Sequence, residues 1–368
     1  MTLKIPNKPA EILTPFPRPD PSPEGLKVLR QICRKAVESD EVYSVTFSDL
    51  LCPEGKNHLF TLKPYYWEVE PGKWEKRDGK RNPYCDKPGG QKQLETAAVT
   101  IHNLALGAAY LPEFRDGCAK RLQRVLKVFF IDPETRMVPE VWYAQCNPGS
   151  KPLKGDYAFE IALRNIILVD QGMQLAASFL NKRTVDTLVN WIATQTKWIR
   201  DSDQGAAARK YEDNKRIWLE AITASHFSFI SPPEGNSYAI SFFQTYAPSH
   251  PPKKFFEHEL QRTLPRHYTL FALEPLFILA ELTLPSSRRL DRYIAQYLRD
   301  LLEFAKQVTP GEIERPLEEQ GRYEGRWQWY ERMLAGWTGQ GQRGGEEPNG
   351  RAWEGGFTQR MRMIWGFI

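Results

Sequence analysis

The sequence predicts an all-α fold in which helices pack as antiparallel hairpins. Between residues 25 and 307, apolar residues recur at intervals of three and four, which places them on one face of a helix. The connections are short and often contain proline, as is typical of neighbouring antiparallel helices. No series of regularly spaced strands is visible, and no helix pair recurs at a fixed period, so the sequence does not indicate a solenoid.

The predicted helices follow one another through the middle of the chain. In order, they lie at residues 25–39, 94–111, 113–130, 157–180, 183–200, 207–230, 236–246, 265–283 and 287–307. In the segment 265–283, Pro265 suits the first helical turn, where its missing N–H group is not needed. Pro275 lies inside the same segment and is expected to kink it.

Two flanking segments differ in composition from this helical part. Proline recurs through residues 1–24, which predicts an extended arm. Residues 309–368 combine a glycine-rich stretch with many aromatic side chains, such as Trp329, and so many aromatic residues are unusual for a disordered tail. We therefore divide the chain into an arm (1–24), an α-helical domain (25–308) and an extension packed on that domain (309–368).

The composition is that of a soluble globular protein. The 368 residues are 41% hydrophobic and 26% charged, and the formal net charge is +5. This charge suits an anionic ligand but is too small to indicate nucleic-acid binding. The 11 Trp, 15 Tyr and 19 Phe include faces on which sugar rings could stack, although most aromatic side chains are expected in the core.

The sequence indicates no membrane span, metal site or cofactor. It has no run of about 18 apolar residues and no apolar core of a secretion signal, so we expect no membrane partner. The expected location is intracellular, unless the first Met was added to a mature secreted chain. Five cysteines lack the spacing of metal ligands and are expected to be reduced thiols, although one or two disulfide bridges stay open.

Residues 52–92 are polar, rich in proline and glycine, and without helical periodicity. A loop of this length in a compact domain usually serves as a lid or a binding loop. It contains two short motifs, Lys63-Pro-Tyr-Tyr-Trp67 and Arg77-Asp-Gly-x-x-Asn-Pro83. The aromatic triplet has two interpretations, contact with a ligand or anchorage of the loop on the domain.

A dense group of ionisable side chains lies at the start of the predicted helix 265–283. Arg262, Arg266, His267 and Tyr268 lie within seven residues. A guanidinium group can hold a carboxylate in a bidentate fork, and its charge favours a neighbouring phenolate. Tyr268 is therefore a candidate for proton transfer beside an acidic ligand. The plain structural alternative is a packed His–Tyr pair with satisfied hydrogen bonds.

The motif Arg262-Thr-x-x-x-His-Tyr-x-x-Phe-x-Leu-Glu274 resembles the catalytic helix of the alginate-lyase family of polysaccharide lyases. Other segments agree with that family in the same order. They are the two motifs of residues 52–92, the turn Asp132-Pro-Glu-Thr-Arg-Met-Val-Pro139, and Tyr143-Ala-Gln145. The resemblance covers roughly residues 60–285. It implies an α/α toroid (an incomplete α/α barrel) with a deep groove across one end and the long loop arching over it.

The resemblance also implies which residues form the site. The expected sugar-binding residues are Lys63, Tyr65, Tyr66, Trp67, Tyr143, Gln145 and Arg266. The expected catalytic residues are Arg262, His267 and Tyr268, together with Asn214 and Lys215 from a second segment.

That second segment departs from the family pattern. The family has Asn-Asn-His-Gly-x-Trp, and alignment on Trp218 places Asp213, Asn214 and Lys215 on its first three positions. In the family the Asn helps to neutralise the substrate carboxylate, and the His is a candidate base. Lys215 has two open roles. In the first, cationic neighbours and burial lower the pKa of Lys215 so that it acts as base. In the second, Lys215 neutralises the substrate carboxylate while Tyr268 is both base and acid in a syn elimination. We prefer the second.

The leading hypothesis is a lyase that cleaves a uronate-containing polysaccharide, alginate-like or glucuronan-like, by β-elimination. Loss of the proton α to a uronate carboxylate requires positioned donors or cations, which Asn214, His267 and Arg262 could supply. Two alternatives keep the fold, namely an intracellular enzyme acting on a small acidic metabolite and a non-catalytic carbohydrate-binding protein. A hydrolase that uses two carboxylates from Glu257, Glu259 and Glu274 explains Arg262 and Tyr268 less well.

Overall fold

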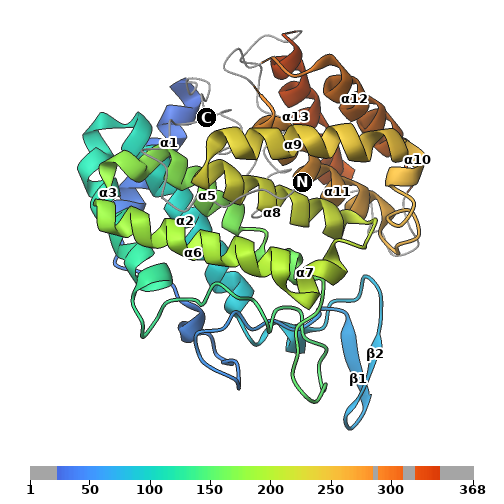
Figure 1. Cartoon of the computed structure of the whole chain (residues 1–368), viewed down its shortest axis with the longest axis horizontal. Coiled ribbons are helices and arrows are strands. Elements are labelled where there is room, and N and C mark those ends of the chain that lie inside the picture. Colours follow the sequence, from blue (N-terminus) through green and yellow to red (C-terminus); the bar gives the residue numbers. More distant parts are fainter. Residues whose placement is uncertain (1–22, 285–288, 310–319, 340–368) are drawn as a thin grey trace.

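The computed structural model of the chain describes residues 23–284, 289–309 and 320–339. It is a two-layered arrangement of helices with a strand hairpin at one edge (Figure 1). The α-helices are α1 (Pro23–Glu38), α2 (Gly90–Tyr110), α3 (Arg115–Leu126), α4 (Phe159–Leu163), α5 (Ile166–Ala176), α6 (Lys182–Asp201), α7 (Asp203–Ala208), α8 (Asn214–Ile230), α9 (Pro232–Tyr246), α10 (Pro252–Phe255), α11 (Pro265–Leu282), α12 (Arg292–Lys306) and α13 (Gln320–Thr338).

The inner layer consists of α2, α5, α8 and α11, each packed against the next. Every residue of α5 is buried, and so are almost all residues of α8, because these helices have neighbours on all sides. Helices α1 and α3 cover α2, while α6 and α9 cover α8, and α12 and α13 cover α11. This pairing of inner and outer helices is the α/α toroid that the sequence resemblance implied.

Helix α13 lies within the segment 309–368 that we set apart by composition. Trp329 and Tyr330 on this helix are buried in the main core. The Tyr330 ring packs 4.5 Å from that of Phe277 on α11, and its hydroxyl donates to the carbonyl of Leu270 at 3.3 Å. This part of the extension therefore packs on the helical domain. Residues 1–22 of the predicted arm (1–24) and residues 310–319 and 340–368 of the extension lie outside the described residues, and α1 begins at Pro23.

The predicted helix 207–230 is wrong at its start, and this error matters for the site. The chain instead forms the short α7, turns, and begins α8 at Asn214. Asp213 caps α8, because its side chain accepts a hydrogen bond from the Lys215 N–H group. The predicted helix 157–180 is likewise divided into α4 and α5. Helix α11 continues through Pro275.

The long loop contains a hairpin that the sequence analysis did not predict. Strand β1 (Tyr66–Glu70) pairs antiparallel with β2 (Lys73–Lys76), and Gly72 in the turn has a φ of +76°. The loop is also tied to the segment after α3, because Lys63 N–H donates to the carbonyl of Cys146 at 2.9 Å. Figure 1 shows the hairpin projecting from the edge of the helical layers near α7.

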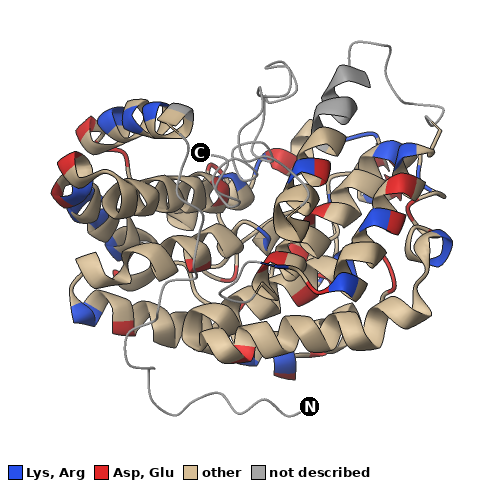
Figure 2. Ribbon diagram, turned by 90° about the horizontal axis from the view of Figure 1, so that it is seen from above, with Lys and Arg blue, Asp and Glu red and all other residues tan. Residues whose placement is uncertain are grey.

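Charged residues of both signs are interspersed over the ribbon, as expected for a chain with a small net charge (Figure 2). The five cysteines are buried and free in this structure. Among the residues that the structure describes, no helix combines the length and apolarity of a membrane span.

Candidate active site

Tyr268 lies in the first turn of α11 and is the centre of the candidate site. Only 6% of the residue is exposed. Its hydroxyl lies 2.7 Å from that of Tyr65, so the long loop reaches the catalytic helix directly. The guanidinium carbon of Arg262 lies 3.6 Å from the centre of the Tyr268 ring, the geometry of a cation–π contact. Helix α11 and the long loop thus meet at the side chain of Tyr268.

Asp78, directly after β2, holds Arg262 in this position. The Arg262 Nε atom lies 3.1 Å from each carboxylate oxygen of Asp78, and Nη2 lies 2.7 Å from Oδ1. Thr263 adds hydrogen bonds from its N–H group and its hydroxyl, at 3.2 and 3.0 Å. Burial alone would raise the pKa of Asp78, but these hydrogen bonds outweigh it and lower the pKa to about 2. Asp78 belongs to the Arg-Asp-Gly motif of the loop, but its contact with Arg262 was not predicted from the sequence.

One expectation about Tyr268 is wrong. We expected the phenol beside Arg262 to exchange its proton more easily than a free tyrosine. Burial, supported by the neighbouring Tyr65, instead raises the pKa of Tyr268 well above its usual value, although Arg262 acts in the opposite direction. The sequence shows the neighbouring charge but not the depth at which the phenol is buried.

Asn214, the first residue of α8, is fixed by Glu259. Its backbone N–H group and its side-chain amide both donate to Glu259 Oε1, at 2.8 and 2.6 Å. Burial raises the pKa of Glu259, and the two hydrogen bonds from Asn214 oppose that effect. Because Glu259 lies only three residues before Arg262, this contact brings the second catalytic segment to the start of α11. In the structure, Glu259 thus holds Asn214 in place.

Lys215 forms an ion pair with Asp213 and lies over two stacked tyrosines. The rings of Tyr157 and Tyr211 are 3.8 Å apart and nearly parallel, with Lys215 Nζ 5.9 and 5.6 Å from their centres. The Lys215 ammonium group is thus paired with one carboxylate and lies near two aromatic rings.

Lys63 makes similar contacts near the same rings. It pairs with Asp156, and its Nζ atom lies 5.7 Å from the centre of the Tyr66 ring and 5.8 Å from that of Tyr157. Two lysines, each with its own aspartate, thus approach the ring of Tyr157. This tyrosine was not predicted as a site residue, because nothing in residues 150–160 distinguishes it from a residue at a helix start.

Glu160 is a further ionisable residue near this cluster, and it was not predicted as a site residue. The residue is completely buried, and neither carboxylate oxygen has a hydrogen-bond partner among the described residues. Burial raises the pKa of Glu160 well above its usual value; the charge of Lys215 lowers it, whereas those of Asp213 and Asp156 raise it further. A carboxyl group in this environment is most stable in its protonated, neutral form.

His267 lies beside Tyr268, with its ring 5.1 Å away and edge-on. It is half-buried and lies parallel to Phe271 at 6.2 Å. Phe271 contacts Trp218, whose ring is 5.4 Å away on α8. Since Phe271 and Trp218 lie one turn after His267 and Asn214, the first turns of α11 and α8 face each other.

Two predicted sugar contacts also make structural hydrogen bonds. The Nε atom of Arg266 donates to the carbonyl of Val308 at 2.8 Å, just beyond the end of α12. Arg266 therefore connects α11 to the segment after α12. The indole N–H of Trp67 donates to the carbonyl of Lys80 at 2.8 Å across the hairpin. This contact supports the anchoring interpretation of Trp67 and leaves its ring half-buried.

Tyr143 and Gln145 shape the neighbouring loop. Gln145 is buried, has a φ of +57°, and donates its backbone N–H to Thr61 Oγ1 at 2.7 Å. A positive φ is uncommon outside glycine and indicates that tertiary contacts impose this conformation. Tyr143 is half-buried and packs edge-on against His58 at 4.9 Å. The Gln145 side-chain amide donates to Thr61 Oγ1 at 3.4 Å, and its contact with a sugar stays a prediction.

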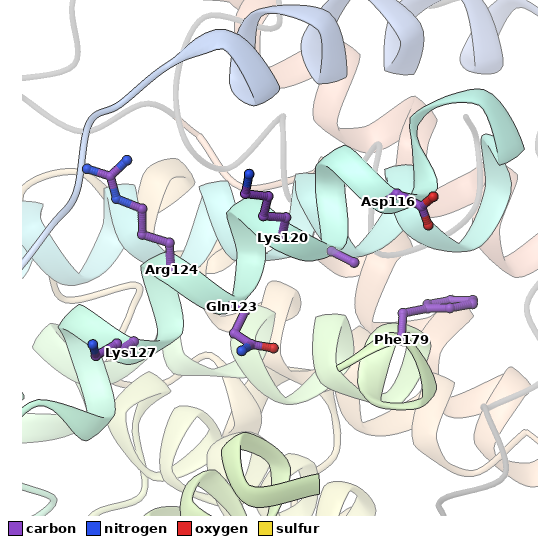
Figure 3. Close-up of a pocket in the computed structure, with 7 residues that line it drawn as sticks. Asp116, Lys120, Gln123, Arg124, Lys127 and Phe179 are labelled. Atoms are coloured by element: carbon purple, nitrogen blue, oxygen red, sulfur yellow. The ribbon is translucent and has the colours of Figure 1, made fainter. Parts of the chain in front are cut away.

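An open hollow of about 520 Å³ lies elsewhere, along α3 (Figure 3). It is lined by Asp116, Ala119, Lys120, Gln123, Arg124, Lys127 and Phe179. None of the predicted site residues borders it. The candidate site is therefore located by its proton-transfer groups and not by this hollow. Within the described residues, no three His, Cys, Asp or Glu side chains gather as metal ligands would.

Comparison with known proteins places this geometry in context. The family model described as alginate lyase matches residues 48–316. A crystal structure of an alginate lyase from Bacteroides ovatus superposes with a TM-score of 0.75 and 18% sequence identity, over 93% of this chain and 92% of that one. At this identity the likeness establishes the fold. No protein with a curated description matches the chain.

Proposed function

The chain belongs to the alginate lyase family, and on that premise we propose that it cleaves a uronate-containing polysaccharide by β-elimination. The observation that carries this proposal is the Tyr268 hydroxyl, buried on α11 between Arg262 and Tyr65. Asn214, His267 and Lys215 lie in the adjoining first turns of α8 and α11. This is the combination of one proton-transfer group and several counter-charges that the reaction requires.

In the proposed reaction, the substrate carboxylate lies against Lys215 and Asn214. Their positive charge and N–H group stabilise the enolate that forms when the proton on the α carbon is removed. Tyr268, as phenolate, takes this proton. The electron pair of the C–H bond forms the double bond of the sugar ring, and the bond to the glycosidic oxygen at C4 breaks. The proton then passes from Tyr268 to that oxygen, which regenerates the phenolate.

The raised pKa of Tyr268 is consistent with its role as acid but makes its phenolate scarce in the free protein. The Arg262 charge is the neighbouring group that favours the phenolate during turnover. The syn elimination by one tyrosine therefore agrees with the geometry better than a lysine base, since Lys215 is paired with Asp213.

A screen of acidic polysaccharides tests the proposal. Purified protein is incubated with polymannuronate, polyguluronate, glucuronan and polygalacturonate, and the ultraviolet absorbance of the unsaturated uronate product is followed. We expect absorbance to rise with at least one polymer. New reducing ends without absorbance would identify a hydrolase. Binding of oligouronates without any product would identify a carbohydrate-binding protein, and turnover of monomeric acids alone would identify a metabolic enzyme.

A further inference from the structure

We propose that Asp78 is a positioning residue, which fixes the Arg262 guanidinium over the Tyr268 ring and thereby holds the catalytic phenol in place. The inference rests on the proposed function of Tyr268. It also changes the expected role of Arg262. From the sequence, the Arg262 guanidinium was a candidate to bind the substrate carboxylate. In the structure, its fork binds the Asp78 carboxylate instead.

The contact is specific in its geometry. Asp78 accepts hydrogen bonds from two nitrogens of Arg262 and two groups of Thr263, so both of its oxygens are used. With this fork satisfied, Arg262 presents the face of its guanidinium to Tyr268. The side chains of Asp78 and Arg262 are 23% and 22% exposed, which shields the pair from much of the solvent. Such a pair is worth more than an exposed one.

The backbone next to Asp78 is adapted to this contact. Gly79 has a φ of +70°, and a Cβ atom added there would overlap with Thr263 Oγ1. Only glycine therefore allows the loop to approach the start of α11 this closely without strain. By contrast, the side chains of the Arg81–Asp86 ion pair in the same loop are 60% and 46% exposed.

The positioning role makes a prediction that differs from a role in substrate binding. Asp78 does not approach the substrate carboxylate, since its two oxygens face Arg262 and Thr263. Removing its charge should therefore change the chemical step more than binding. A catalytic group misplaced by about 1 Å can lose about 10²-fold in rate.

The experiment compares D78N and R262K, alone and combined, with D86N as the matched control from the same loop. Steady-state kinetics are measured on the polymer that the wild type cleaves. We expect kcat to fall roughly 10- to 100-fold in D78N with KM little changed, and D86N to match the wild type. We expect the double variant to be no worse than the poorer single variant, because both changes break one unit.

Two results would overturn the inference. One is a raised KM in D78N with an unchanged kcat, which would show that Asp78 serves substrate binding. The other is additive losses in the double variant, which would show that the two residues act separately. Thermal unfolding of each variant distinguishes these results from a failure to fold. If the wild type itself cleaves no polymer, the proposed function fails instead. The Asp78–Arg262 contact is then tested without activity, by the expected increase in amide hydrogen exchange at residues 63–80 in G79A.

Discussion

The hydroxyl groups of Tyr65 and Tyr268 lie 2.7 Å apart, although 203 positions separate the two residues in the chain. One belongs to the loop that carries the hairpin, and the other to the first turn of α11. The candidate site is therefore assembled from both, and neither element contains it alone.

Replacing Tyr268 by phenylalanine should abolish elimination while leaving the fold intact. The change removes one hydroxyl and keeps the ring on which Arg262 lies, so packing is preserved. Loss of a general acid–base group costs roughly 10²- to 10⁴-fold in rate. The measurement is the initial rate of absorbance increase, with calorimetric oligouronate binding as the control. A Tyr268→Phe variant with wild-type kcat would exclude the phenol from the chemistry, and Tyr65→Phe should be impaired less.

Replacing Lys215 distinguishes its two possible roles. If the ammonium group only provides counter-charge, Lys215→Arg should retain much of the activity, whereas Lys215→Ala should lose affinity and rate together. The measurement is kcat and KM for the three proteins. Should Lys215→Arg be as inactive as Lys215→Ala while still binding oligouronates, Lys215 would be the base and the single-tyrosine mechanism would be wrong.

The Asp78 contact should contribute acid-sensitive stability. The pKa of Asp78 is lowered from 3.8 to about 2, so the folded state favours the ionised carboxylate. Its contribution is present above pH 4 and disappears as the pH falls through about 2. At neutral pH it amounts to roughly 2 kcal/mol. The free energies of unfolding of the wild type and D78N, measured in urea, should therefore converge as the pH falls from 4 to about 2. A difference that stays constant with pH would contradict the assignment.

Glu160→Gln should stabilise the protein at neutral pH. Burial raises the pKa of Glu160, so the folded state favours the protonated carboxyl group. The free energy of unfolding should therefore fall as the pH rises above about 4.5, the pKa of this group in the unfolded chain. Glutamine has a similar shape and carries no charge to desolvate. We expect the gain over wild type to grow from pH 4 to pH 8 in urea unfolding. Destabilisation at every pH would mean that the carboxyl group makes a hydrogen bond that glutamine cannot replace.

Several features of the fold were predictable because they depend on neighbours in the chain. The apolar spacing located α2, α6 and α11 to within a few residues, since helix formation and amphipathicity are local properties. The start of α8 was not predicted, because the polar run before Asn214 continues the helical pattern and only the cap at Asp213 shows where the helix begins. The hairpin was not predicted because β1 and β2 are short and none of their residues is fully buried, so no pattern of buried residues marks them in the sequence.

The candidate residues themselves were visible in sequence motifs, but their partners were not. Arg262, His267, Tyr268 and Asn214 stood out by type and spacing. Their environment depends on segments far away in the chain, as with Asp78 at Arg262 and Glu259 at Asn214. Sequence position does not reveal such contacts, and it also conceals burial, which reversed the expected pKa shift of Tyr268.

The sequence by itself determined the helical class and the resemblance to a family of lyases, because residue type and short-range spacing encode these properties, and it made Tyr268 the candidate for proton transfer. Only the tertiary structure decided that Arg262 holds an aspartate of the long loop and that Arg266 binds a distant carbonyl. The physical reason is that electrostatic partners and desolvation are set by which segments the packed helices bring together.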